Sequence, residues 1–240
     1  MLIKHGKNEK SKNFIVFAIM LSLLLTNIKM LTVRADNSFW SSTAIADFIY
    51  NDVNLSKNIL SDEKYTSNIT REEFVELIVS MYALSNKISK EDIPLEDNPF
   101  KDTNSIDVQR AYSLGLIKGI SQDEYDPLAD VTREAFSTIV IRFLNIKGIQ
   151  TEIKGNLNDF IDKKDISEWA YTAMLYCVNH GIINGFNKEL YPKAATSIEQ
   201  ALTIMDRIAL DYKWFIASKD SYYDGFLVPR DAEVTIYTSG

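Results

Sequence analysis

An internal repeat constrains the fold of this chain more than any other feature of its sequence. The phrase Ile69-Thr70-Arg71-Glu72 returns as Val131-Thr132-Arg133-Glu134, and a weaker third copy reads Thr196-Ser197-Ile198-Glu199. The two arginines lie 62 positions apart, and Ile198 follows the second arginine by 65. Self-similarity at a fixed period is typical of proteins that stack one supersecondary unit several times. We therefore expect three copies of one structural unit.

Each copy of the phrase is followed by the same apolar pattern, with apolar residues at positions i, i+3, i+4, i+7 and i+8. Three matching stripes at the helical period predict three amphipathic helices that face a shared core. A shorter helix is expected before each of them. The stripes begin at Phe74, Phe136 and Ala201, and the shorter helices are expected at 42–51, 105–114 and 166–180.

Further motifs mark the start and the loop of each unit. Phe100-Lys101-Asp102 corresponds to Phe160-Ile161-Asp162, and the loop 115–119 (Gly-Leu-Ile-Lys-Gly) corresponds to 181–185 (Gly-Ile-Ile-Asn-Gly). An aromatic residue then precedes proline, in Tyr125-Asp126-Pro127 and in Tyr191-Pro192. The prediction is an all-α protein with three helix-loop-helix repeats, at 36–90, 96–148 and 157–212. The tail 213–240 is expected to hold a loop at Tyr222, Tyr223 and Phe226 and a short strand at 234–237.

The N-terminus is typical of an export signal. Four lysines precede an apolar run at 14–25, and Val33-Arg34-Ala35 offers a small-residue cleavage site. Twelve apolar residues are too few to span a bilayer, which takes roughly 20. We predict a signal peptide at 1–35; an uncleaved anchor reaching Val33 is the alternative. The single cysteine, Cys177, excludes an internal disulfide.

Removal of residues 1–35 leaves 20 basic and 32 acidic residues, a net charge of −12. Nucleic-acid binding needs a basic surface, and so does adhesion to anionic lipid. We therefore expect neither nucleic acid nor, after signal cleavage, a membrane as partner. An anionic partner must be held at local basic sites.

Helix capping explains most of the repeated phrase. Thr70 with Glu73 forms a capping box, and Ser197 with Gln200 forms another. The arginines are not explained, because a cation in the first helical turn faces the positive end of the helix dipole. An anion site at the helix N-terminus is one interpretation. A salt bridge of Arg71 or Arg133 to a nearby acid, Asp102 or Asp162, is the other.

The ordered motifs resemble the S-layer homology domain family of bacterial cell-surface proteins. The best copy is the third, with Phe160-x-Asp162, Trp169, the glycine loop at 181–185 and Tyr191-Pro192. The second copy lacks the tryptophan, and the first matches well only at 65–84. The resemblance covers residues 40–212.

The resemblance implies a pseudo-threefold module around a central helical bundle, which attaches proteins non-covalently to the cell wall by binding secondary cell-wall polysaccharide. Its ligand is typically a ketal-pyruvylated amino sugar whose carboxylate meets the repeated arginine. Carried over, the ligand-binding residues are Arg71, Arg133, Thr70, Thr132, Gly119, Gly185 and Trp169. Trp169 is either a stacking face or a core residue. Because Ile198 replaces the third arginine, at most two competent sites are expected.

The resemblance also implies an extracellular protein at the cell wall, which we expect to be monomeric. We expect no enzyme activity, no catalytic residue, no cofactor and no metal site, since Cys177 and His180 alone cannot bind zinc and no nucleophile–base pair stands out. Two alternatives stay open. One is a surface module that binds a protein partner, and the other is the anchoring part of an enzyme whose catalytic domain lies elsewhere.

Overall fold

The structure is a computed structural model of the 240-residue chain and describes residues 39–61, 64–223 and 226–229. The signal peptide expected at 1–35 and the strand expected at 234–237 lie outside these residues, so both stay predictions. Within the described residues no helix is both long and apolar enough to cross a membrane.

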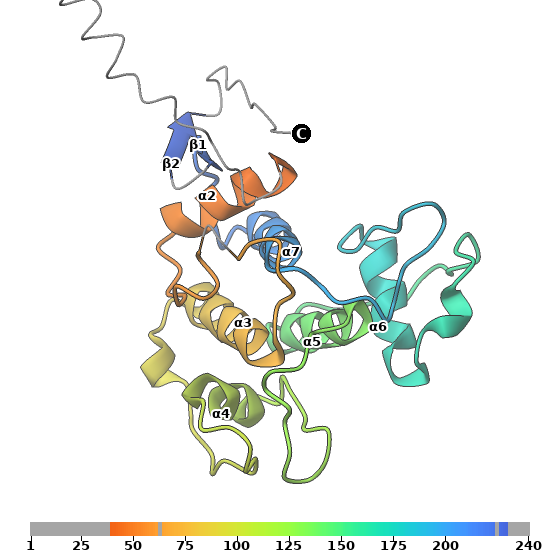
Figure 1. The fold of residues 1–240 in the computed structure, drawn as a ribbon, viewed down its shortest axis with the longest axis horizontal. Coiled ribbons are helices and arrows are strands. Elements are labelled where there is room, and N and C mark those ends of the chain that lie inside the picture. The colour runs from red at the N-terminus through yellow and green to blue at the C-terminus, as the bar shows by residue number, and fades with distance from the viewer. Residues whose placement is uncertain (1–38, 62–63, 224–225, 230–240) are drawn as a thin grey trace, which may run out of the picture. The chain divides into compact units, whose positions relative to one another are not determined.

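The described residues are mainly helical, which confirms the all-α prediction (Figure 1). The tail differs from expectation, because Tyr222, Tyr223 and Phe226 lie in an antiparallel hairpin rather than in a loop. The helices are α2 (Ser42–Tyr50), α3 (Arg71–Asn86), α4 (Ile106–Ser113), α5 (Arg133–Ile146), α6 (Glu168–Asn179) and α7 (Ile198–Asp211), with the 3-10 turns Phe39–Ser41, Lys90–Asp92 and Lys163–Asp165 and the strands β1 (Asp220–Tyr223) and β2 (Phe226–Pro229).

The three long helices begin where the capping residues place them. Thr70 and Glu73 form a complete capping box at α3, and Ser197 and Gln200 form another at α7. Thr132 caps α5 by accepting a hydrogen bond from the backbone N–H of Ala135. These starts put the repeated position, Arg71, Arg133 or Ile198, at the first residue of each long helix.

The segments that precede the long helices are joined in a closed ring of backbone hydrogen bonds. Ile69 N–H donates to the Thr196 carbonyl at 2.9 Å, Thr196 N–H donates to the Val131 carbonyl at 2.9 Å, and Val131 N–H donates to the Ile69 carbonyl at 3.0 Å. Each repeat therefore donates one bond and accepts one bond at this ring. The pseudo-threefold arrangement of the entire module stays a prediction.

Each long helix packs against the short helix of the following repeat. α3 packs on α4, α5 packs on α6, and α7 returns to pack on α2 (Figure 1). The β1 strand also packs against α2. The helix pairs are thus formed between repeats, and the third repeat closes onto the first.

The glutamates of the repeated phrase add further contacts between neighbouring repeats. Each accepts a hydrogen bond from a hydroxyl group near the start of the following repeat, in addition to its favourable place near the positive end of the helix dipole. The bonds are 3.0 Å long and join Glu72 to Thr103, Glu134 to Ser167 and Glu199 to Ser41.

The largest hydrophobic core is shared by all three repeats. Residues of α2, α3, α5 and α7 belong to one buried cluster. Phe74 of α3 and Phe136 of α5 are both fully buried there, and their rings stack with centroids 4.5 Å apart. A smaller cluster around Met174 lies beneath α6. The shared core fixes the long helices and therefore the side chains at their first turns.

Candidate functional site

Arg71 is anchored to the loop of the second repeat. Its Nε donates to the Tyr125 carbonyl at 2.9 Å, and its Nη2 donates to the Lys118 carbonyl at 3.3 Å. The guanidinium carbon lies 4.4 Å from the centroid of the buried Tyr125 ring. A guanidinium has five N–H donors, so this anchoring orients the group and leaves donors for a ligand.

Arg133 repeats this arrangement with the loop of the third repeat. Its Nε donates to the Leu190 carbonyl and its Nη2 to the Asn184 carbonyl, each at 2.8 Å. Burial lowers the pKa of Arg133, and the nearby charge of Asp162 opposes that effect. The two arginines are therefore equivalent in position and in anchoring.

The salt bridges that were the alternative interpretation of these arginines are absent among the described residues. The carboxylate of Asp102 instead accepts hydrogen bonds from the backbone N–H groups of Tyr125 and Asp126, at 2.9 and 2.7 Å, and these bonds lower its pKa. Asp162 accepts from Leu190 and Tyr191 in the same way. These acids hold the turns whose carbonyl groups anchor the arginines.

This geometry also corrects the pairing of aromatic residues before proline. The carbonyl that anchors Arg71 belongs to Tyr125, and the one that anchors Arg133 belongs to Leu190. Tyr125 therefore corresponds to Leu190, and Tyr191 corresponds to Asp126. Both Asp126 and Tyr191 have positive φ, at 60° and 52°. The sequence comparison was wrong by one residue because it matched side-chain type rather than backbone conformation.

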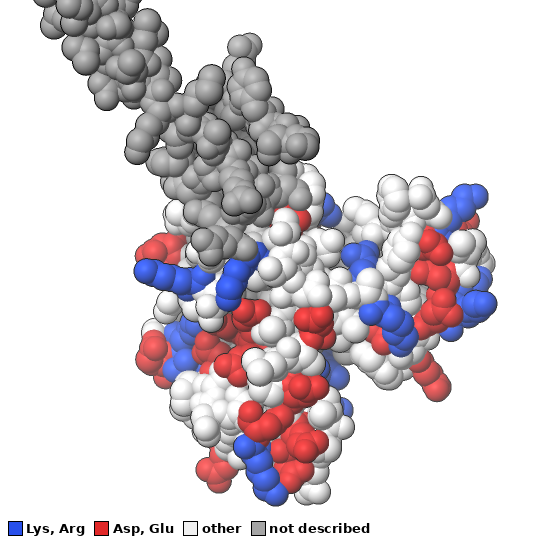
Figure 2. Space-filling model, in the orientation of Figure 1, with Lys and Arg blue, Asp and Glu red and all other residues white. Residues whose placement is uncertain are grey.

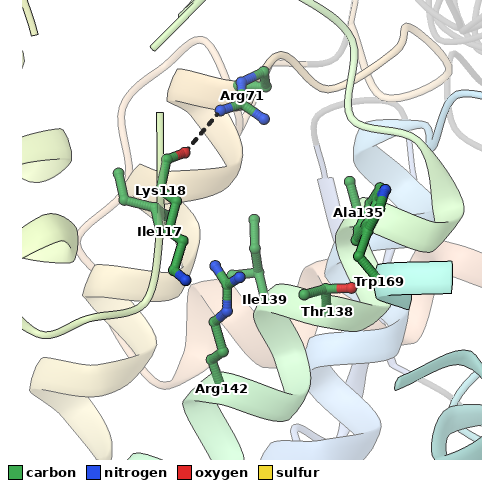
Figure 3. Close-up of a pocket in the computed structure, with 8 residues that line it drawn as sticks. All are labelled: Arg71, Ile117, Lys118, Ala135, Thr138, Ile139, Arg142 and Trp169. Atoms are coloured by element: carbon green, nitrogen blue, oxygen red, sulfur yellow. Dashed lines mark hydrogen bonds between the residues drawn. The ribbon is translucent and has the colours of Figure 1, made fainter. Parts of the chain in front are cut away.

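Arg71 lies at one end of a groove of about 450 Å³ that is open to solvent (Figure 3). The groove joins three repeats: Arg71 from the first, a loop and α5 from the second, and Trp169 from the third. We name it the Arg71 groove, and it is lined by Arg71, Ile117, Lys118, Ala135, Thr138, Ile139, Arg142 and Trp169.

A second groove, of about 600 Å³, lies at the equivalent position beside Arg133. Its loop belongs to the third repeat, its helix is α7, and its tryptophan comes from the first repeat. We name it the Arg133 groove, and it is lined by Trp40, Arg133, Ile182, Ile183, Asn184, Gln200, Thr203, Ile204 and Arg207.

Tryptophan lines both grooves. Trp169 is 60% exposed, so the core interpretation of this residue was wrong. Trp40, 49% exposed, is its counterpart, and sequence reasoning missed this role. The signal was present, since Trp, Thr and Ala share one spacing in 40–44 and 169–173.

Sequence reasoning also missed a second arginine in each groove. Arg142 on α5 and Arg207 on α7 lie 65 positions apart, the same interval that separates Arg133 from Ile198. Both arginines were missed because the comparison of the repeats considered only the phrase at the helix start and the apolar stripe.

Four of the expected ligand-binding residues do not line either groove. The Thr70 hydroxyl is used in its capping box with Glu73, and the Thr132 hydroxyl caps α5. A Cβ at Gly119 would lie 2.4 Å from the Ser121 carbonyl oxygen, so the turn itself requires this glycine. These residues shape the fold around the grooves.

Gly185 provides a test of that interpretation. A Cβ there would lie 2.4 Å from Cε1 of Phe160 and 2.6 Å from the Glu189 carbonyl oxygen. We expect Gly185→Ala to lower the free energy of unfolding by about 1–3 kcal/mol, as overpacking does, measured by urea denaturation. Unchanged stability with weakened wall binding would instead favour a direct role of Gly185 at the ligand.

The third equivalent position differs in all its key residues. Ile198 stands in place of the arginine and is 1% exposed. Glu76 takes the place of Thr138, and its carboxylate accepts a hydrogen bond from the Ser56 hydroxyl at 2.8 Å. Ser80 takes the place of Arg142 and donates to the Asn54 carbonyl. This position therefore carries isoleucine and serine where the two grooves carry arginines, and a carboxylate where they carry Thr138 and Thr203.

Cys177 and His180 have structural surroundings. Burial raises the pKa of the Cys177 thiol to about 12, so its reactive thiolate form is scarce at neutral pH. His180 lies at the end of α6, where its Nδ1 is 2.9 Å from the Tyr176 carbonyl oxygen and its ring stacks on Tyr176.

Comparison with protein families identifies two of the repeats. The model of the S-layer homology domain matches residues 99–137 and 160–202. These two segments are S-layer homology domains. They correspond to the second and third repeats, and between them they supply α4, all of α6, both groove loops and the first turns of α5 and α7. The first repeat lies outside the two matches and is recognised by its place in the hydrogen-bonded ring.

The chain is also similar to longer curated proteins. An endoglucanase of Bacillus sp. (strain KSM-635) is 24% identical over 170 residues, which are 70% of this chain and 17% of that protein. An amylopullulanase of Thermoanaerobacterium thermosulfurigenes is 25% identical, and the exoglucanase XynX of Acetivibrio thermocellus is 26% identical, each across 61% of this chain. The alignments span 8% and 13% of those two proteins.

Among solved structures, an undecaheme cytochrome from the S-layer of Carboxydothermus ferrireducens aligns with a TM-score of 0.38 and 14% identity, covering 71% of this chain and 20% of that one. The identification of the two segments rests on the domain matches alone. The two matched domains point to the bacterial cell surface as the location of this chain.

Proposed function

We propose that this protein is a non-enzymatic module that attaches non-covalently to the cell wall by binding an acidic secondary cell-wall polysaccharide in the Arg71 and Arg133 grooves. The observation that carries the proposal is the pair of guanidinium groups at equivalent helix N-termini. Each is oriented by two carbonyl groups, forms no salt bridge among the described residues, and lines a groove with an exposed tryptophan.

The chemistry of each groove suits a glycan carboxylate. A guanidinium binds a carboxylate through paired, charge-assisted hydrogen bonds, and the indole offers a flat apolar face to a sugar ring. The overall charge opposes anion binding, since Figure 2 shows acidic side chains gathered on the visible face over the part that contains α4. The grooves are local exceptions, because no acidic residue lines either one.

Co-sedimentation with purified cell walls tests the proposal. We expect the protein to sediment with intact walls and to stay in the supernatant after the secondary polymer has been extracted. Adding the extracted polymer to intact walls should release the bound protein by competition. Equal sedimentation with both wall preparations, or with neither, would contradict the proposal.

A second candidate function is the anchoring part of a larger glycan-degrading enzyme. The observation in its favour is that three similar proteins are named as glycan hydrolases and that this chain spans less than a fifth of each. In that case wall binding is unchanged, and a catalytic domain is supplied by another part of the polypeptide. A longer reading frame at the genomic locus would support it.

A further inference from the structure

The Arg71 groove gathers three cations, Arg71, Lys118 and Arg142, while its other lining residues are uncharged. In the view of Figure 3, Lys118 and Arg142 project from one side of the groove and Trp169 from the other. Like charges at close quarters repel one another, and a groove that is partly shielded from water screens this repulsion less than bulk solvent does. A single bound carboxylate would neutralise only one of the three charges.

Arg142, like Arg71, is held in place by a hydrogen bond to a backbone carbonyl group. Its Nη1 donates to the Leu116 carbonyl at 3.1 Å, and its side chain is half-buried. Burial lowers the pKa of Arg142, and no carboxylate pairs with it among the described residues. Arg142 and Arg71 are anchored on carbonyl groups two residues apart, which a chain can separate by no more than about 7 Å. One sugar residue with its substituents can reach both.

The fold itself does not require these additional charges. At the position of Arg142, α3 carries Ser80, although the same backbone framework is kept. At the position of Lys118, the Arg133 groove carries Asn184. The three-cation arrangement is therefore particular to the Arg71 groove, and the Arg133 groove keeps only two cations, Arg133 and Arg207.

We infer that the Arg71 groove binds a sugar residue that carries two anionic groups, one held by Arg71 and the other by Arg142 with Lys118. This inference rests on the proposed function and specifies its ligand class. Both carboxylate and phosphate accept the paired donors of arginine, and lysine binds phosphate as a point charge. The wall polymer recognised in this groove is thus more highly charged than one that bears a single carboxylate per unit.

Calorimetric titration with three synthetic probes tests the inference. The probes are the methyl glycoside of a 4,6-pyruvyl-ketal N-acetylhexosamine, which has one carboxylate, its 3-phosphate and its 3-O-carboxymethyl ether. The titrations use Arg133→Ala protein, so that only the Arg71 groove reports. We expect at least one doubly anionic probe to bind about tenfold more tightly than the first, and the better of the two distinguishes phosphate from carboxylate.

Variants assign that gain to the second anion site. Arg142→Gln and Lys118→Asn should each remove most of this advantage, so that the ratio of the affinities for the doubly and singly charged probes falls from about tenfold to less than about threefold. Lys101→Gln, at a lysine whose side chain is 80% exposed and lies outside both grooves, is the matched control and should change neither affinity. Equal affinity for all three probes would overturn the inference alone. Binding of none of them would overturn the proposed carboxylate recognition as well.

Discussion

Replacing both Arg71 and Arg133 with alanine is expected to abolish sedimentation of the protein with cell walls. Hydrogen bonds to a charged group contribute about 1.5–3 kcal/mol each, so loss of one guanidinium should weaken its groove by about 10–150-fold for each bond that it makes to the ligand. Two grooves on one polymer reinforce each other through a high effective concentration. Each single variant should therefore keep weak binding, and only the double variant should lose it.

The same substitutions carry a structural effect that must be measured separately. Each arginine bonds two loop carbonyls, so alanine exposes these groups to water and loosens the loop. Because both sites are half-exposed, we expect the melting temperature to fall by only a few degrees, in line with a cost of about 1 kcal/mol per site. Circular dichroism and thermal unfolding provide this measurement.

A matched control variant removes two positive charges at positions outside both grooves. Lys101 and Lys154 have side chains that are 80% and 81% exposed and lie outside both grooves. Lys101→Ala with Lys154→Ala should bind walls like the unchanged protein. A folded Arg71/Arg133 double variant that still binds walls as this control does would rule out the arginines as the ligand contacts.

Local features of the fold were predictable from the sequence. The capping boxes at Thr70 and Ser197 depend on residues three positions apart, and the apolar stripes depend on a period of 3.6 residues. Both lie within one helix, so one sequence is enough to reveal them. The structure confirmed the helix starts for this reason.

The partners of the arginines were not predictable in the same way. Arg71 bonds the carbonyls of Lys118 and Tyr125, which lie 47 and 54 positions further along the chain. A repeat spacing does not say whether a long helix meets the loop of its own repeat or that of the next. The nearby acids Asp102 and Asp162 suggested ion pairs, but each carboxylate binds backbone N–H groups of the turn.

Because the helix pairs are formed between repeats, we expect Phe136→Ala to destabilise the entire module. Phe136 is fully buried and stacks on Phe74 of the neighbouring repeat. Truncation of a buried phenylalanine costs about 3–5 kcal/mol, from lost burial and from the cavity left behind. We expect the urea midpoint to fall accordingly. Ile120→Ala, at a side chain that is 60% exposed, is the control and should change stability by less than about 0.5 kcal/mol.

The loss of stability in Phe136→Ala should affect all three repeats equally and not the second repeat alone. α5 carries Phe136 and packs on α6, while α3 packs on α4 and α7 packs on α2, so unfolding of any one repeat breaks two of these three helix pairs and takes one pair from each remaining repeat. The hydrogen-bonded ring through Ile69, Val131 and Thr196 is broken when any one of these three segments unfolds. Variants that retain only Trp40 or only Trp169 as fluorescent reporter should therefore show the same unfolding midpoint. Separate midpoints in these two variants would mean that the repeats unfold independently, in contradiction to the interlocked core.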